Sequence, residues 1–350
     1  MKATTLGKSQ RAVLYADIGY PEKTDVGLSK IIGISPGRIS TIRSQLIHDG
    51  YYHEIKIPSL DLLGYEGIGI VIAEPKIIHP SDRAGAQKIM GDVAQNPNIL
   101  YAIENGEIIL FVTAFPRLSQ HEEFADQVFE SCCRFSKEEC DISITNFPLE
   151  HSKIYSFWDF SSLLYHRFNL HIIPPKESTS YGRNSKHVEF DMDDLRILDI
   201  MVRQPVANDA DLAKLIGVSL STFRRNKDRV MSNGLCKRAF VPDISKLGFE
   251  LCVFSLLRLN PLRTRMGEID HIRSLVSPLP FLMMSRKSMA FIGHCFSDYT
   301  SYTKYSANVL SELKKGLIHM DVLRTITCST MNMREIKPLD FSGVLTPLLS

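Results

Sequence analysis

The sequence predicts an α+β fold in which two winged helix-turn-helix domains alternate with two ferredoxin-like (β-α-β-β-α-β) domains. Three observations predict it. A helix–glycine–helix pattern occurs twice, the copies are offset by 184 residues without a gap, and each copy is followed by the same order of strands and helices. A chain of 350 residues is too long for one ordinary core and suits several domains.

The clearer copy of the pattern begins at Leu212. Leu212, Leu215 and Ile216 recur at helical spacing and form one apolar face. Gly217 ends that helix, because glycine accepts the left-handed conformation that a helix end needs. Ser219 is a good N-cap for the helix that follows. A short helix, a tight turn and a second helix with a cationic start are typical of a unit that places the second helix in the major groove of DNA.

The other copy keeps the residues that make turns and core. The matched pairs are Pro21 with Pro205, Asp25 with Asp209, Leu28 with Leu212, Lys30 with Lys214, Ile32 with Ile216, Gly33 with Gly217, Ser35 with Ser219, Gly50 with Gly234, Pro58 with Pro242, Leu63 with Leu247 and Gly64 with Gly248. Because turn and core residues recur together, the pattern indicates an internal duplication.

Hydrophobic periodicity and turn residues give the order of elements in each half. In the first half we predict a helix that begins at 12–14, a second at 25–32 and a third that Ser35 caps and Gly50 ends, strands at 51–57, 68–73, 99–103, 108–114 and 141–147, and helices at 84–94 and around 124–129. Asn105-Gly106 is a strong hairpin signal between two of these strands. In the second half we predict helices at 191–201, 266–276 and 299–315, with strands at 249–259, 281–285, 289–296 and 318–331.

These elements predict six segments. They are helix-turn-helix domain 1 at 1–63, ferredoxin-like domain 1 at 64–149, a connecting helix and linker at 150–190, helix-turn-helix domain 2 at 191–247, ferredoxin-like domain 2 at 248–336 and a tail at 337–350. The strand at 51–57 is expected to be a hairpin arm or wing, and 151–170 a helix that holds the single tryptophan, Trp158.

Composition and charge limit where the protein can act and what it can bind. The sequence has no run of about 18 apolar residues and no apolar signal core near its first residues, so we expect a cytoplasmic protein. Its net charge of +2 neither favours nor excludes nucleic acid. Seven scattered cysteines without a C-x-x-C pair fit reduced thiols. Cys132, Cys133 and Cys140 with His121 match no closed zinc site, so no metal is predicted.

The motifs Ile32-Gly33-Ile34-Ser35 and Ile216-Gly217-Val218-Ser219, each with a following α/β domain, resemble the Lrp/AsnC (feast/famine) family of transcription regulators. The resemblance implies that the helical domains bind double-stranded DNA and that the α/β domains pair through their sheets, giving a homodimer or higher oligomer. It also implies a small-molecule effector near the turn that holds Gly106. The second copy has Ser285-Arg286-Lys287-Ser288 at that turn, without glycine. Arg43 and Lys227 stand where the family has an apolar core residue.

The predicted DNA-binding residues lie at the starts and outer faces of the two recognition helices. In the first they are Ser35, Pro36, Gly37, Arg38, Ser40, Thr41, Arg43 and Ser44, and in the second Ser219, Ser221, Thr222, Arg224, Arg225, Lys227 and Arg229. Arginine can pair bidentately with guanine, and serine and lysine can hold phosphates. The second helix is the more cationic. A solvated basic face is the alternative explanation of these charges.

Enzyme motifs are sparse. The chain has no glycine-rich phosphate loop, no G-x-S-x-G and no H-E-x-x-H. One enzyme class stays open, because siroheme decarboxylases look like the same family fold, include fused two-copy forms, lack DNA binding and hold a tetrapyrrole with histidine and arginine. His121, His271, His294 and Arg286 are the candidates here. A third possibility is an interaction scaffold whose helical domains have lost DNA binding.

We therefore predict a sequence-specific DNA-binding transcription regulator, modulated by a small-molecule effector, that is not an enzyme and needs no cofactor. The alternative is a siroheme decarboxylase-like tetrapyrrole enzyme on the same duplicated scaffold.

Overall fold

The computed structural model describes residues 6–74, 90–106, 108–134, 141–174, 190–259, 278–314 and 320–349. Its contacts divide the chain into two compact units. Unit 1 comprises Met1–Glu54, Ser152–Tyr181 and Arg238–Met331, and unit 2 comprises Ile55–His151, Gly182–Lys237 and Asn332–Ser350. Each unit therefore joins the helical domain of one repeat to the α/β domain of the other.

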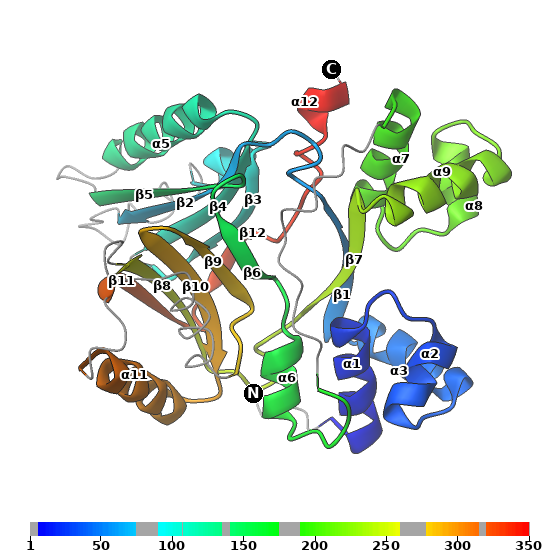
Figure 1. Cartoon of the computed structure of the whole chain (residues 1–350), viewed down its shortest axis with the longest axis horizontal. Coiled ribbons are helices and arrows are strands. Elements are labelled where there is room, and N and C mark those ends of the chain that lie inside the picture. Colours follow the sequence, from blue (N-terminus) through cyan, green and yellow to red (C-terminus); the bar gives the residue numbers. More distant parts are fainter. Residues whose placement is uncertain are drawn as a thin grey trace. The chain divides into compact units, whose positions relative to one another are not determined.

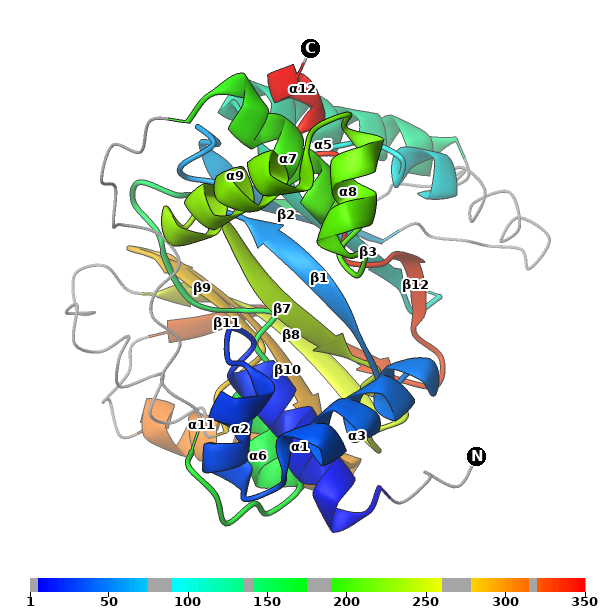
Figure 2. The same ribbon diagram turned by 90° about the vertical axis from the view of Figure 1, so that its right-hand side faces the viewer.

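Unit 1 holds the first three-helix domain and the second sheet (Figures 1 and 2). The helices are α1 Lys8–Gly19, α2 Asp25–Ile32 and α3 Pro36–His48. The sheet has the order β11-β8-β10-β9-β6, with β8 Leu251–Leu259, β9 Leu282–Arg286, β10 Met289–Phe296, β11 Met320–Ser329 and β6 Lys153–Phe157. Helix α11, Tyr299–Lys314, packs on β10, and α6, Ser161–Arg167, packs on α1.

Unit 2 repeats this plan with the first sheet and the second three-helix domain. The sheet has the order β12-β3-β4-β2-β5, with β2 Gly67–Glu74, β3 Ile99–Glu104, β4 Ile109–Phe115, β5 Asp141–Pro148 and β12 Arg334–Lys337. Helix α5, Leu118–Cys133, covers one face of the sheet, as Figure 1 shows. The helical domain consists of α7 Met192–Arg203, α8 Asp209–Leu215 and α9 Leu220–Ser232, and α12, Thr346–Leu349, packs on α7.

Apart from β6 and β12, which add at one edge, the four strands of each sheet have ferredoxin-like order, which confirms the predicted fold class. The α/β core of unit 2 lies between α5 and the sheet and includes Phe111, Phe115 and Phe124. Local signals act as expected, since Gly33 and Gly217 have φ of 70° and 71° and Ser219 accepts a hydrogen bond from the Thr222 amide. The predicted helix at 84–94 lies largely outside the described residues, and that at 266–276 lies wholly outside them.

The connecting segments differ from the predictions. Residues 151–170 were expected to be one helix, but β6 and α6 form there, and β6 pairs with β9. The β-branched and aromatic residues Ile154, Tyr155 and Phe157 suit a strand. After the second α/β domain, β12 adds to β3 in the same way. Strand β1, Tyr52–Pro58, is not the arm of a local hairpin; it pairs with β7, Cys236–Pro242. None of the described helices is long and apolar enough to cross a membrane.

Candidate functional site

The sheet of unit 1 carries three arginines on one face. Side chains of adjacent strands that are directly opposite point to the same side of a sheet, and successive side chains along a strand alternate. Met289 of β10 is opposite Arg286 of β9 and also opposite Arg258 of β8. Arg324 of β11 is opposite Leu256, two residues before Arg258. The three guanidinium groups therefore belong to one face, towards one end of the strands.

The surface between these arginines is apolar. Leu256, Phe291 and Met284 stand opposite one another across β8, β10 and β9 and are almost fully buried. The Nε atom of Arg286 is buried and has no hydrogen-bond partner among the described residues. One carboxylate, Asp321, is opposite Arg258. A buried guanidinium N–H without an acceptor is costly, so this face is suited to a ligand that brings anionic oxygens.

The same positions of the first repeat have no cations. The sheet registers align Arg258 with Glu74, Arg286 with Asn105, and Arg324 with Ser143. The last pair follows because Arg324 is opposite Leu256, Ser143 is opposite Ile72, and Leu256 and Ile72 are equivalent residues of the two repeats. The arginine face therefore belongs to unit 1 alone.

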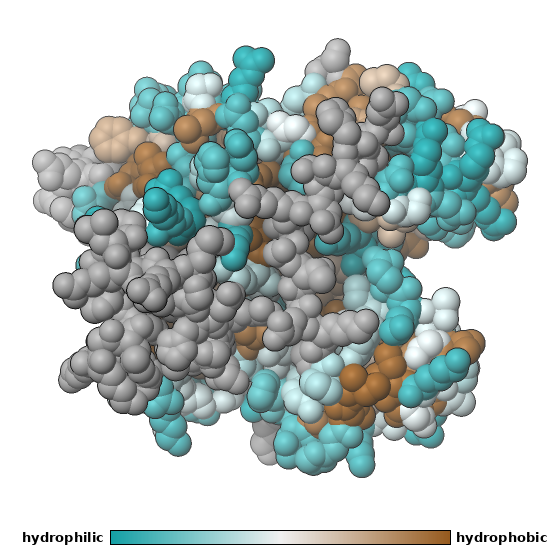
Figure 3. All heavy atoms as spheres, viewed as in Figure 1, coloured by the Kyte–Doolittle hydropathy of each residue, from teal (hydrophilic) through white to brown (hydrophobic). Residues whose placement is uncertain are grey.

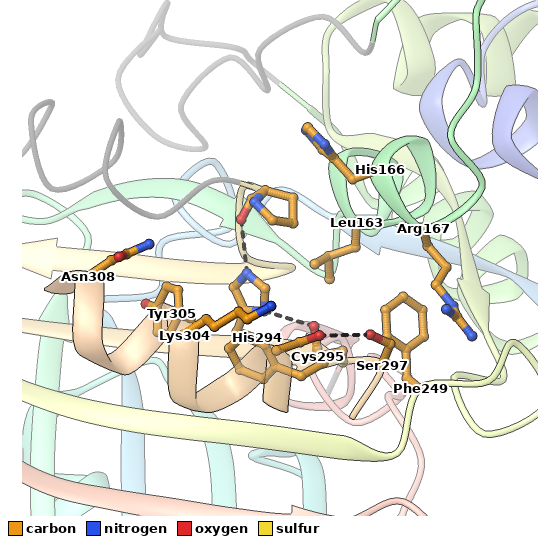
Figure 4. Close-up of a pocket in the computed structure, with 13 residues that line it drawn as sticks. Leu163, His166, Arg167, Phe249, His294, Cys295, Ser297, Lys304, Tyr305 and Asn308 are labelled. Atoms are coloured by element: carbon orange, nitrogen blue, oxygen red, sulfur yellow. Dashed lines mark hydrogen bonds between the residues drawn. The ribbon is translucent and has the colours of Figure 1, made fainter. Parts of the chain in front are cut away.

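A cavity of about 440 Å³ lies on the opposite side of the same sheet, between α6, the end of β10 and α11 (Figure 4). It is lined by Leu163, His166, Arg167, Phe249, Pro278, His294, Cys295, Phe296, Ser297, Ser301, Lys304, Tyr305 and Asn308. The side chain of His294 must point away from the arginine face, because it is five residues from Met289 along β10 and its ring lies 5.4 Å from that of Tyr305 on α11.

His294 is held between two carbonyl groups. Its Nδ1 lies 2.9 Å from the oxygen of Cys295 and its Nε2 lies 2.9 Å from the oxygen of Pro278. A neutral imidazole has one N–H, so it can donate to only one of them. Burial lowers the pKa of His294 to about 4, against the effect of the two carbonyl contacts, which raise it. The ring is therefore neutral at pH 7, and one nitrogen faces an oxygen without a proton between them.

The predicted DNA-binding cations are mostly paired within their own domains. Arg43 binds Asp17 and Asp25, each at 2.6 Å. At the equivalent place in the second repeat, Lys227 binds Asp209 at 2.7 Å. An ion pair thus takes the position where the resembled family has an apolar residue.

The remaining cations of these helices divide into two groups. Arg229 binds Asp191 and Asp194, and Arg224, although 63% exposed, lies 3.5 Å from Asp209. Arg38 and Arg225 are exposed and make no hydrogen bond or ion pair among the described residues. Over residues 191–234 the Lys and Arg side chains equal the carboxylates in number, so the three helices of the second helical domain carry no net charge.

Most of the hydroxyl groups predicted to contact DNA make hydrogen bonds within their own domains. Thr41 and Ser44 donate to the carbonyl oxygens of Gly37 and Ser40. The hydroxyls of Ser221 and Thr222 lie 2.9 and 2.8 Å from that of Ser219. Ser35 is the N-cap residue of α3 and Pro36 its first residue, but the Ser35 side chain makes no capping bond. In Figure 3 hydrophilic residues cover most of the second helical domain, whereas the first shows more apolar surface.

The other sequence candidates are separated. Gly106 is exposed in the β3–β4 turn with φ of 92°. His121, on α5 in unit 2, is buried with neither ring nitrogen hydrogen-bonded among the described residues. Cys140 and His271 lie outside the described residues. No group of three His, Cys, Asp or Glu side chains in the described part of the chain could hold a metal ion.

Sequence reasoning found Arg286 but missed Arg258 and Arg324. Both end or interrupt apolar strands, at Leu257-Arg258-Leu259 and Leu323-Arg324-Thr325. A charged residue within a strand was the available signal, but only the register of three strands brings these arginines together.

No protein-family model and no curated protein matches the chain. Among solved structures, the siroheme decarboxylase NirDL matches over 97% of both chains, with 14% sequence identity and a TM-score of 0.51. NirDL in complex with an iron-uroporphyrin III analogue matches over 98% of this chain and 99% of that one, with 13% identity and a TM-score of 0.51. Escherichia coli AsnC covers 41% of this chain and 93% of its own, with 16% identity and a TM-score of 0.31.

These matches show that the whole duplicated chain shares its fold with NirDL. The prediction that the chain is not an enzyme is wrong, since both full-length matches are with an enzyme.

Proposed function

We propose that the chain is an enzyme that binds an iron tetrapyrrole of the siroheme type and removes carboxylate groups from it. Siroheme is a flat macrocycle with carboxylate side chains at its rim, and it would be the substrate. The observation that carries the proposal is the arginine face of unit 1, where three arginines lie on the same side of the sheet as buried apolar side chains.

The chemistry of the two partners is complementary. Leu256, Met284 and Phe291 lie beside the arginines and are almost fully buried, so they make the surroundings of the guanidinium groups apolar, which suits a macrocycle with apolar faces. Guanidinium groups bind carboxylates bidentately, which fixes orientation as well as affinity. Arginine stays protonated throughout the accessible pH range, so these residues would hold and orient the carboxylates and not supply the proton that replaces CO2. The full-length fold shared with a siroheme decarboxylase supports the same substrate class.

Absorption titration of the full-length protein with siroheme tests the proposal. We expect a saturable spectral change with the unaltered protein. Arg286→Gln and Arg258→Gln should each weaken binding about tenfold, since one charge-assisted hydrogen bond contributes roughly 1.5 kcal/mol. The matched control is Arg38→Gln, an exposed arginine without a described partner, which should bind normally.

Product analysis completes this test. Mass spectrometry of the tetrapyrrole after incubation should show loss of CO2. A protein that gives no saturable spectral change, or arginine variants that bind like Arg38→Gln, would refute the proposal.

Binding of duplex DNA is a second candidate function, favoured by the exposure of Arg224 and Arg225 on α9. Fluorescence anisotropy with duplex DNA at two salt concentrations tests it, because displacement of counterions makes such affinity fall steeply with salt. Replacing both arginines by alanine should abolish that salt dependence, whereas Lys214→Ala on α8 should retain it. Equal affinity in both variants would exclude α9 as a DNA-binding helix.

A further inference from the structure

The cavity beside α6 and α11 is separate from the arginine face in three ways. It lies on the other side of the sheet, at the other end of β10, and none of the three arginines lines it. Its walls come from α6, which follows the first α/β domain in the chain, and from the second α/β domain. The chemistry of its lining can therefore be considered independently of the tetrapyrrole proposal.

The charged side chains of the lining are all cationic or titrate to cations. Arg167, Lys304 and His166 are present, and no Asp or Glu belongs to the lining. The guanidinium of Arg167 is fixed, because its Nη2 donates to the Gly248 oxygen at 3.0 Å and its carbon lies 5.9 Å from the centre of the Phe249 ring. Lys304 is exposed and makes no ion pair among the described residues. An anion entering the cavity meets the ammonium group of Lys304, whereas the neighbouring carboxylate of Asp298 accepts hydrogen bonds from the Ser297 hydroxyl and the Ser301 amide.

Aromatic rings form much of the rest of the wall. The rings of His294 and Phe296 are stacked at 4.4 Å, and Tyr305 lies 5.4 Å from His294. Figure 4 shows α6 and α11 on either side of His294. Ser297, Ser301 and Asn308 add neutral hydrogen-bonding groups. Apolar walls with a few convergent polar groups are typical of sites for small organic ligands, and the volume is within their usual range.

We propose that this cavity is a second binding site, specific for a small aromatic carboxylate. The ring of the ligand packs among Phe249, Phe296 and Tyr305, and its carboxylate is bound by Lys304. The hydroxyls of Ser297 and Ser301 lie 3.2 Å apart, and that of Ser297 donates to the Asp298 carboxylate at 3.1 Å, so Lys304 and not these hydroxyls is the donor to the ligand. Such a site discriminates an acid from its neutral amide by charge, and from inorganic phosphate by the ring.

Isothermal titration calorimetry of the full-length protein tests this site with three probes, namely benzoate, phenylacetate and indole-3-acetate. We expect at least one to bind saturably, at one site per chain, and its amide to bind at least tenfold more weakly. Inorganic phosphate should also bind at least tenfold more weakly than the best probe. Three carboxylates without saturable binding, or an amide or phosphate that binds as tightly, would overturn the proposal.

Variants assign the binding to this cavity. Lys304→Gln should weaken the carboxylate about tenfold and leave the amide unchanged, because only the ion pair is lost. Lys30→Gln, another exposed lysine of unit 1, is the control and should bind normally. If Lys304→Gln does not fold, Asn308→Ala serves instead, with a smaller loss. Equal affinities in the cavity variant and the control would place the ligand elsewhere.

A further variant separates this site from the proposed tetrapyrrole site. Arg286→Gln should leave the carboxylate affinity unchanged, and a saturating carboxylate should leave the siroheme titration unchanged. Loss of carboxylate binding in Arg286→Gln would mean that the cavity is not a separate site. Failure of siroheme to bind would leave the carboxylate result intact, so the two proposals can fail independently.

Discussion

The two repeats have the same backbone plan but use equivalent positions for different chemistry. On the sheet face away from the helices, Arg258, Arg286 and Arg324 of the second repeat replace Glu74, Asn105 and Ser143 of the first. On the helix side, His294 of the second repeat occupies the place of Thr113. The exchange shows that a duplication leaves the apolar pattern in place while polar positions at strand ends become free to diverge.

The helical domains diverge in a similar way. Both keep an aspartate at the first residue of the second helix, Asp25 and Asp209, and both pair it with a cation on the third helix. Only in the first domain does this cation also bind a buried carboxylate, that of Asp17, which accepts a hydrogen bond from Tyr52 as well. The same ion pair is thus central to one domain and peripheral in the other, which gives the largest predicted difference between them.

Removing the cation should cost far more in the first domain than in the second. Arg43→Met leaves the Asp17 carboxylate, which is 1% exposed, without its counter-charge, and this should cost about 3 kcal/mol of unfolding free energy. Lys227→Met leaves Asp209, which is 25% exposed, and should cost about 1 kcal/mol or less. Urea unfolding of both variants measures the difference. Equal losses would show that the two pairs are energetically alike.

The two repeats also differ in the packing between sheet and helix, at Gly69 of β2 and His121 of α5. A Cβ at Gly69 would clash with Nε2 of His121 and would lie 2.6 Å from Oγ1 of Thr113. Gly69→Ala should therefore cost about 2 kcal/mol, and His121→Ala in the same chain should recover part of it. The second repeat has Val253 at this position, opposite His294.

Gly91→Ala is the matched control for this clash, because nothing lies within 4 Å of the added Cβ. Its stability should be unchanged or slightly higher, since alanine favours a helix over glycine. If Gly69→Ala were as harmless as Gly91→Ala, His121 would not be held against β2.

Much of this architecture can be predicted from the sequence, because the two copies of the repeat align residue by residue. Glycines such as Gly33 and Gly217 fix helix ends locally, so the predicted boundaries there agree with the structure. The short strand at 153–157 was missed because its partner, β9, lies more than a hundred residues away. The arginine face was missed for the same reason. Ion pairs such as Arg43 with Asp17 join different helices, and spacing alone does not reveal them.

Each repeat buries one histidine between sheet and helix, which predicts a pH dependence of stability. Burial lowers the pKa of His121 to about 4 and that of His294 to about 4, whereas an unfolded histidine has a pKa of about 6.5. The unfolded chain therefore gains protons first as the pH falls. Stability is present above about pH 6.5 and is lost progressively down to about pH 4, by roughly 1.4 kcal/mol per pH unit for each histidine.

Urea midpoints measured between pH 7 and pH 4 test this dependence. His121→Leu should make the fall of the midpoint with pH shallower, and the remaining slope should come from His294 and the carboxylates. Comparing slopes removes any constant cost of the substitution itself. An unchanged slope would mean that His121 is protonated in the folded protein or reaches water.

The smallest expected effects belong to the cations that have no described partner. Arg38→Ala and Arg225→Ala remove exposed side chains without an ion pair among the described residues, so each should change the unfolding free energy by no more than about 0.5 kcal/mol. Arg229→Ala should cost more, because it leaves the buried Asp194 without its 2.7 Å partner. Stability measurements on the three variants would order them. A cost above about 1 kcal/mol for Arg225→Ala would show that this arginine stabilises the fold, and would remove the main reason to regard it as available to DNA.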